Sequence, residues 1–383
     1  MNIIIFFIIL LVLVLVHEFG HFFAAKKFGI RVDEFGFGFP PKIFSVKKGE
    51  TEYSLNALPF GGFVKIFGEN FDEADFVEVG FLEKDLQTKQ DFSRSFVHQA
   101  KWKQAIVLFA GVFANFLLAW LLFSIGFMSG LPASVGSGIN YKLQNVNLMI
   151  ISVLNDSPAY FSGLKSGDKI ISVKSLPTKQ TDLPEILNEI NPDTLKSFII
   201  SRSEKEIEIG YLRGKEKNIR ITEVIPVQKS TNEEPMIGVS MDMIGTAKLP
   251  VFSAFKEGML LTLFVTKSTV LGLFTLISEG IRGKGSFDSI TGPVGMVGIV
   301  GAAYQFGFVY LLSFTALISV NLAIINLLPF PALDGGRLFF LLIEKIKGSR
   351  INPKVANMAN MVGFSILILL MLAVTFHDIV KLF

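Results

Sequence analysis

The most restrictive feature of this sequence is an unbroken apolar run over residues 3–16, which continues into His17-Glu18-Phe19-Gly20-His21. At ~1.5 Å per residue, residues 3–25 form a helix long enough to cross a hydrocarbon core of ~30 Å. A cleaved signal peptide would need a basic segment ahead of the run, and only Met1 and Asn2 precede it. Because ionisable groups inside a membrane helix are costly, their presence here predicts a membrane span that carries a functional site.

The composition supports a membrane protein and excludes several other classes. Half of the 383 residues are hydrophobic, only 18% are charged and 39 are Phe, which leaves too few polar groups to cover a soluble surface. The net charge of +3 is small and dispersed, so we expect no nucleic-acid partner. The chain has no Cys, which excludes disulfides, thiolate metal sites and a cysteine nucleophile.

The distribution of apolar segments predicts a multi-span α-helical protein with four transmembrane helices. The segment near residues 259–277 is ambiguous, because Lys267 and a Thr/Ser-rich face interrupt it, and we expect it to lie on the membrane surface. The predicted divisions are a first transmembrane helix (1–28), a β-loop followed by an acidic loop (29–103), a second transmembrane helix (104–130), a small α/β domain (143–228), an amphipathic surface element (251–283), a third transmembrane helix (304–336) and a fourth (356–377).

Two polar regions carry strand patterns. Residues 35–66 alternate in polarity and contain Gly and Pro, which is typical of short strands and turns. Within residues 143–228 we expect strands at 150–153, 169–173, 197–200 and 218–221, and short helices at 157–164 and 183–190. About 85 residues of mixed structure suffice for one small domain.

The sequence His17-Glu18-Phe19-Gly20-His21 is an H-E-x-x-H motif on a predicted helix. Residues four apart lie on one helix face, so His17 and His21 can bind one metal ion. Glu18 lies beside that face, where it can accept a proton from water at the metal. Imidazole ligands without thiolates favour Zn²⁺, whose catalytic sites use three protein ligands and one open position.

Three residues are candidates for the third ligand. His98 lies in a polar loop and His377 ends the last apolar segment, so we expect the first to be solvated and the second to be interfacial. Asp334 follows an apolar segment that is interrupted by two Pro and two Gly residues. Irregular backbone at membrane depth is tolerated where it lines a cavity, and we therefore predict Asp334 as the third ligand.

These motifs resemble those of the site-2 protease family of intramembrane zinc metalloproteases. The family pattern combines H-E-x-x-H in the first membrane helix with N-x-x-P-x-P-x-L-D-G in a later one, and residues 326–335 match the second motif completely. Gly111-Val112-Phe113-Ala114-Asn115 fits the family's G-x-x-x-N. Within the family, the chain is most similar to the bacterial branch of the regulator of sigma-E protease, although only one PDZ-like domain fits between residues 143 and 228.

The resemblance implies a multi-span fold with a membrane-reentrant β-loop and one inserted α/β PDZ-like domain. It implies a protease in the bacterial cytoplasmic (inner) membrane. Lys and Arg residues follow the first and third spans, which predicts that the active site lies towards the cytoplasm and the PDZ-like domain outside. The expected substrates are single-span membrane proteins, such as anti-sigma factors or signal-peptide remnants. The implied site consists of catalytic Glu18, the zinc ligands His17, His21 and Asp334, and the substrate-binding residues Asn115, Asn321, Asn326, Pro329 and Pro331.

A transmembrane substrate must unwind before its amides can be attacked, and an unwound backbone in lipid lacks hydrogen-bond partners. Pairing of the substrate as an extra strand on the β-loop would supply them. A zinc-binding membrane transporter and a non-proteolytic membrane chaperone are the alternatives. The intact Glu18 beside His17 argues against both, because neither function requires a general base.

Overall fold

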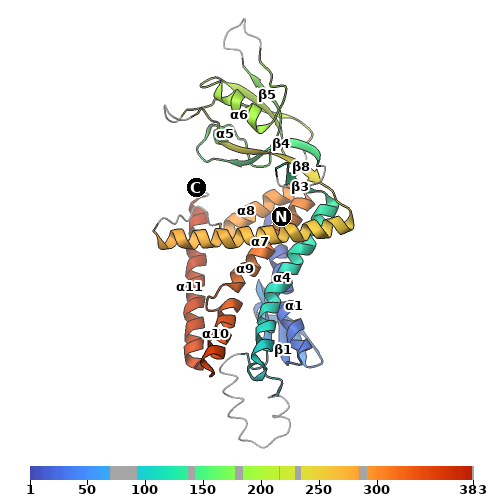
Figure 1. Cartoon of the computed structure of the whole chain (residues 1–383), viewed down its shortest axis with the longest axis vertical. Coiled ribbons are helices and arrows are strands. Elements are labelled where there is room, and N and C mark those ends of the chain that lie inside the picture. The colour runs from blue at the N-terminus through green and yellow to red at the C-terminus, as the bar shows by residue number, and fades with distance from the viewer. Residues whose placement is uncertain are drawn as a thin grey trace, which may run out of the picture. The chain divides into compact units, whose positions relative to one another are not determined.

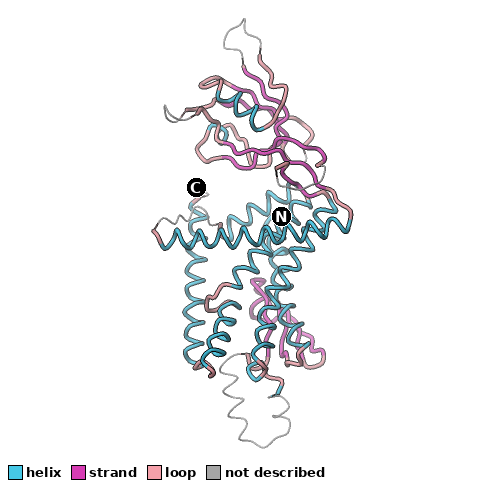
Figure 2. Tube along the Cα trace, viewed as in Figure 1, coloured by secondary structure: helices cyan, strands magenta, loops and turns pink. Residues whose placement is uncertain are grey.

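The computed structural model describes residues 1–69, 93–136, 143–176, 184–214, 216–228, 234–283 and 291–381. The chain divides into two compact units. The first unit comprises Met1–Phe123, Phe255–Gly301 and Phe314–Phe383, and the second comprises Ser124–Ala254 and Ala302–Ser313. The path of the chain is drawn in Figures 1 and 2. Most of the predicted acidic loop lies outside the described residues.

Long apolar helices make up most of the first unit. Within the described residues, five helices are long and apolar enough to cross a membrane, and the chain is therefore a multi-span membrane protein. They are α1 (Asn2–Lys27), α4 (Lys101–Ser129), α7 (Val251–Ile281), α9 (Phe308–Leu327) and α11 (Pro353–Val380). Shorter helices are η2 (Phe96–His98), α8 (Pro293–Phe306) and α10 (Asp334–Lys347).

Helix α7 differs from the other four long helices in direction and in burial. Figure 1 shows it running across α4, α9 and α11, which run roughly alongside one another. Only 6% of its most apolar window is buried inside the protein, compared with 39% for α4. Its contacts include the Trp120 indole N–H, which donates to the carbonyl of Phe255 at 2.8 Å.

The predicted β-loop is a long hairpin of β1 (Val32–Lys48) and β2 (Thr51–Ile66) that folds over into four arms. Phe35 pairs with Val64 on one side and with Tyr53 on the other, and Tyr53 also pairs with Val46. The arms therefore follow the order 62–66, 32–37, 51–55, 42–48 across the sheet. We call residues 62–66 the edge arm and residues 42–48 the outer arm, because each has a partner arm on one side only among the described residues.

Ion pairs attach this sheet to the neighbouring helices. In the hairpin turn, Glu50 accepts hydrogen bonds from Arg94 at 2.7 Å and from Lys26, at the end of α1, at 2.6 Å. The Arg94 guanidinium, with Lys26, lowers the pKa of Glu50 to about 2, so the carboxylate keeps its charge at neutral pH. Glu69, just after β2, pairs with Arg337 on α10.

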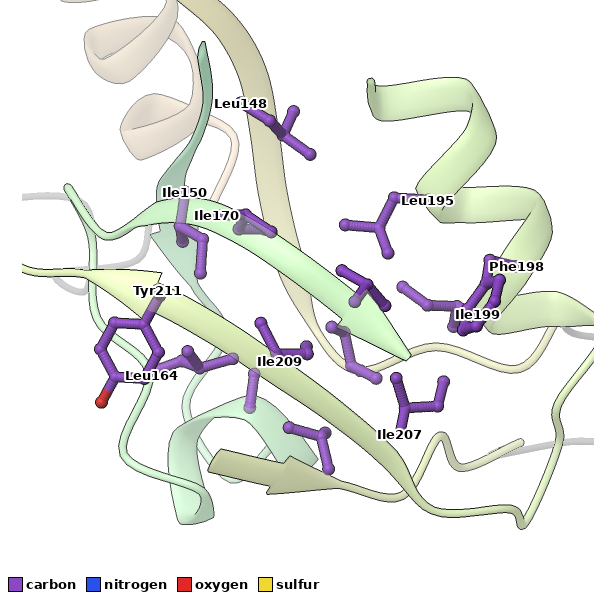
Figure 3. Packing of buried hydrophobic residues seen from close by; sticks show 14 residues of the cluster. Leu148, Ile150, Leu164, Ile170, Leu195, Phe198, Ile199, Ile207, Ile209 and Tyr211 are labelled. Carbon is purple, nitrogen blue, oxygen red and sulfur yellow. The ribbon is translucent and has the colours of Figure 1, made fainter. Parts of the chain in front are cut away.

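The second unit contains a six-stranded sheet in the order β3-β8-β4-β5-β6-β7, with neighbouring strands antiparallel. Its strands are β3 (Leu131–Ser134), β4 (Gln144–Val153), β5 (Lys169–Ser175), β6 (Ile207–Leu212), β7 (Arg220–Val224) and β8 (Val239–Ala247). The helices α5 (Pro158–Phe161) and α6 (Pro192–Ile200) pack with it. Figure 3 shows Leu195 of α6 directed towards Ile170, and Phe198 and Ile209 belong to the same apolar core.

Two local predictions in this unit are wrong. Residues 197–200 end helix α6 instead of forming a strand, because Asn191 and Thr194 make a capping box that starts a helix there. Residues 184–190 contain no helix, and Ile186 instead forms an isolated bridge with Lys174. The sheet also includes β3 and β8, so the compact unit extends beyond 143–228 on both sides.

Candidate metal centre

Helix α1 carries the two histidines on the face that packs against α4. His17 and His21 are each only 7% exposed, although much of α1 is exposed. Close contact between the helices depends on Gly20, because a Cβ there would lie 2.3 Å from the carbonyl oxygen of Ala110. The imidazoles therefore lie against the backbone of α4.

Asp334 is positioned by a tight bend between α9 and α10. The prediction placed Asp334 and the glycines at the end of a helix, but they form the first turn of a new one. A Cβ at Gly335 would lie 2.2 Å from the carbonyl oxygen of Leu327, and one at Gly336 would lie 2.2 Å from that of Phe330. The two glycines thus allow α10 to start directly against the end of α9, which directs Asp334 to α1.

The three predicted ligands meet at one point. The Nε2 atoms of His17 and His21 are 3.3 Å apart, and Asp334 Oδ2 lies 3.0 Å from the first and 3.2 Å from the second. Ligand atoms ~2.0–2.1 Å from a tetrahedral zinc ion are about 3.3 Å apart, so these separations match the edges of a zinc tetrahedron. No other group of His, Asp or Glu side chains with this convergence occurs in the described ranges, and neither His98 nor His377 joins this one.

The hydrogen bonds around His21 and Asp334 test whether the cluster fits a metal ion. His21 Nδ1 donates to the carbonyl oxygen of Val107 at 2.9 Å, so the neutral ring presents an unprotonated Nε2 to Asp334. Asp334 Oδ2 is buried and has no hydrogen-bond donor among the described residues. Lone pairs of a carboxylate and an imidazole that face each other repel unless a proton or a metal ion lies between them, and a metal ion satisfies both histidines and Asp334 Oδ2 at once. The residues present therefore fit a bound Zn²⁺.

The structure distributes the predicted substrate-binding residues over different surroundings. Asn326 Nδ2 lies 3.4 Å from His17 Nε2, at the metal centre. Asn115 is fully buried and lies 3.4 Å from His17 Nδ1, on the far side of the ring from the ligand atom. Asn321 accepts a hydrogen bond from Thr269 of α7 at 2.9 Å and is not brought to the cluster. Pro331 packs on Gly363 of α11, and Pro329 is exposed.

Sequence reasoning missed three contributions to this centre. Every residue has a backbone carbonyl, so nothing in the sequence could have indicated that the carbonyl of Val107 accepts the hydrogen bond of His21. Gly111 lies under the ring of His21, and its position four residues before Asn115 in the G-x-x-x-N motif was the available signal. Arg337 follows Asp334 by one helical turn, and its pairing with Glu69 connects β2 to the helix that begins at Asp334.

Comparison with known proteins identifies a family for the chain. The pattern of peptidase family M50 matches residues 5–370. The chain is 32% identical to the zinc metalloprotease RasP of Geobacillus kaustophilus, with 100% of this chain and 98% of the relative covered. It is 34% identical to a putative zinc metalloprotease of Clostridium perfringens, with 96% and 95% covered. It is 31% identical to the regulator of sigma-W protease RasP of Bacillus subtilis, with 100% and 99% covered.

The chain therefore belongs to peptidase family M50, the site-2 protease family, and the family predicted from the two motifs is confirmed. It is accordingly an enzyme, a metalloprotease with several apolar helices. The sequence predicts that the chain belongs to the branch of the regulator of sigma-E protease. That prediction is close, because one of these relatives is named as the regulator of sigma-W protease.

Proposed function

We propose that this protein is a zinc metalloendopeptidase that hydrolyses peptide bonds within the transmembrane segments of single-span membrane proteins. The observation that carries the proposal is the convergence of His17, His21 and Asp334 on one point beside the apolar helix α1. Membership of a peptidase family favours this reading over a transporter or a chaperone. Zinc bound at these three ligands supplies Lewis-acid activation of water and of the scissile carbonyl.

Glu18 is the general base in this proposal. It follows His17 directly on α1, so its carboxylate lies beside the ligand face without belonging to the three converging ligands. It accepts a proton from the attacking water and then gives that proton to the leaving amine. Asn326, at 3.4 Å from His17 Nε2, is close enough to donate a hydrogen bond to the substrate carbonyl. No covalent intermediate with the protein is needed.

The edge arm is the part of the sheet that receives the unwound substrate. A Cβ at Gly62 would lie 3.3 Å from Glu18 Cγ and 3.1 Å from Val14 Cγ1, so this arm runs against α1 beside the general base. Residues 62–66 have no strand on their outer side among the described residues. A substrate strand paired there would exchange its helical hydrogen bonds for β-sheet bonds close to the catalytic carboxylate.

Family membership also suggests which substrates the protein cleaves and what the second unit does. One relative is named as the regulator of sigma-W protease, which supports anti-sigma factors, already trimmed by another protease, or signal-peptide remnants as substrates. We propose that the second unit is a PDZ-like domain, with Ser157-Pro158-Ala159 at the start of α5 and Gly167-Asp168 at the start of β5. Its role is to select trimmed substrates by size or by their new terminus.

We further propose four membrane spans in the bacterial cytoplasmic membrane, with α7 on the outer surface. His17 and His21 lie near the C-terminal end of α1, and Asp334 follows the C-terminal end of α9, so both helices must cross in the same direction. If α7 also crossed, α9 would run the opposite way. The transverse path and slight burial of α7 support a surface position (Figure 1).

The distribution of basic residues orients these spans. Positive charge favours the cytoplasmic side, and basic residues gather after α1 and after α9. The first group consists of Lys26 and Lys27, which end α1, and Arg31, Lys42, Lys47 and Lys48 beyond it; the second consists of Arg337, Lys345, Lys347 and Arg350. The metal centre therefore lies towards the cytoplasm and the PDZ-like unit lies outside.

Cysteine labelling tests this topology without background, because the chain has no Cys. Single variants Ser162→Cys, Glu257→Cys and Gly283→Cys are expected to react with an impermeant thiol reagent applied to intact cells. Lys48→Cys and Lys347→Cys should react only after the membrane is permeabilised. Labelling of positions 257 and 283 from opposite sides would show that α7 crosses the membrane and would overturn the four-span proposal.

The activity is tested by incubating the purified protein in detergent with a single-span model substrate. We expect cleavage within the transmembrane segment, its loss in the presence of a zinc chelator, and its recovery when Zn²⁺ is added back. Cleavage that persists after the metal has been removed, or cleavage confined to the soluble part of the substrate, would contradict the proposed function.

A further inference from the structure

One face of α4 forms a continuous surface behind the two histidines. Val107, Gly111 and Asn115 are spaced by four residues, so they lie one above another on the same side of the helix. Each of the three has a separate contact with a histidine of the centre. Val107 provides the carbonyl that accepts the Nδ1 proton of His21 at 2.9 Å.

Gly111 provides the space that the His21 ring occupies. A Cβ at this position would lie 2.3 Å from Nε2, 2.6 Å from Cε1 and 2.8 Å from Cδ2 of that ring. All three separations are shorter than any non-bonded contact between such atoms. The ring cannot simply move aside, because its Nδ1 is hydrogen-bonded to Val107 on the same helix. A methyl group at position 111 would therefore displace Nε2, which is the ligand atom.

Asn115 occupies the corresponding position behind His17. Its side-chain amide lies 3.4 Å from His17 Nδ1, and the residue is fully buried. Its Oδ1 is buried without a hydrogen-bond partner among the described residues. The amide oxygen and nitrogen have nearly the same shape, and exchanging them lets Oδ1 accept a hydrogen bond from the His17 Nδ1–H group. His17 then presents an unprotonated Nε2 to the metal, as His21 does.

We propose that α4 is the positioning surface of the metal centre, with Gly111 and Asn115 as its positioning residues. Gly111 admits the ring of His21, and Asn115 fixes the orientation and tautomer of His17. This inference rests on the proposed ligand set of His17, His21 and Asp334. It also assigns Asn115, which the sequence predicted to bind substrate, to the histidine instead.

The test compares Gly111→Ala with Gly126→Ala in the purified full-length protein. Both glycines lie in α4, and a Cβ at Gly126 would contact chiefly the flexible end of the Leu131 side chain at 2.6 Å. Alanine favours helix equally at both positions, so the comparison isolates the contact with His21. We expect Gly111→Ala to weaken Zn²⁺ binding by about 10–100-fold and to shift the visible bands of the Co²⁺-substituted protein. Gly126→Ala should behave as the unsubstituted protein in both measurements.

If Gly111→Ala does not fold, a second pair of variants, at Asn115, tests whether α4 positions the histidines. Asn115→Leu removes the acceptor at similar volume and should weaken Zn²⁺ binding by about 10–100-fold, whereas Asn115→Asp restores an acceptor and should recover most of the affinity. Unchanged metal affinity and Co²⁺ spectra in Gly111→Ala, or equal effects of Leu and Asp at position 115, would overturn the inference. If the unsubstituted protein binds no Zn²⁺, the ligand set itself is wrong.

Discussion

Glu18→Gln is expected to bind about one zinc ion per chain, as the unsubstituted protein does, while its cleavage rate falls by about 10²–10⁴-fold. Glutamine has the shape of glutamate but cannot accept the proton of the attacking water. Because Glu18 is not one of the three converging ligands, the metal should remain. Metal analysis of the purified protein and the rate of cleavage of a transmembrane substrate give the two measurements.

Substitution of the three zinc ligands should have a different effect from Glu18→Gln. His17→Ala, His21→Ala and Asp334→Ala should each lose zinc and cleavage together, since each removes one of three protein ligands. His98→Ala serves as a control, because His98 lies outside the cluster and its removal should leave both measurements unchanged. Full zinc occupancy in Asp334→Ala would refute the third ligand, and loss of zinc in Glu18→Gln would refute a purely catalytic role.

The second large effect is expected at the edge arm. Proline cannot donate to a neighbouring strand, and consecutive backbone N–H groups in a strand point in opposite directions. Of Phe63→Pro and Val64→Pro, one therefore removes a donor that faces outwards and the other removes one that pairs with β1. The outward variant should keep its zinc and its melting temperature but cleave about tenfold more slowly or worse for each hydrogen bond lost.

The outer arm offers a matched control. Ser45 and Val46 lie on the opposite edge of the same sheet, and of Ser45→Pro and Val46→Pro the one that removes an outward-facing N–H should have little effect on cleavage. Proline at Tyr53 is not informative, because that residue pairs with arms on both sides and its substitution damages the sheet itself. If both edge-arm variants fold, retain zinc and cleave at the normal rate, the substrate does not pair with residues 62–66.

The parts of the structure that depend on local patterns were predictable. The apolar run of α1, the four-residue spacing of His17 and His21 and the apolar core of α9 are properties of short segments, and they appear as expected. The convergence of Asp334 on the histidines was predictable for another reason. The Pro and Gly residues around Asp334 interrupt an apolar segment, which indicated a cavity there, and the match of residues 326–335 to a family pattern connected that segment to histidines more than 300 positions away.

What the sequence did not reveal depends on contacts between distant segments. Strand β8 joins the sheet by pairing with β3 and β4, and nothing within residues 239–247 identifies those partners. The apolar residues of 197–200 suit a strand or a helix equally well, and the capping box at Asn191 decides for the helix. In the sequence, Gly111 is an ordinary small residue of a membrane helix, and only the structure shows that the ring of His21 lies against it.

The position of the edge arm beside Glu18 also constrains where a substrate can be cut. Side chains of a paired strand alternate between the two faces of a sheet, so a shift by one residue turns the strand over, whereas a shift by two restores the same face. A substrate bound on residues 62–66 therefore presents every second peptide bond to the general base in the same orientation. If the substrate pairs as proposed, the possible cleavage positions are therefore spaced by two residues, and we expect the side chains at alternate positions of the substrate, more than any single one, to determine which bond is hydrolysed.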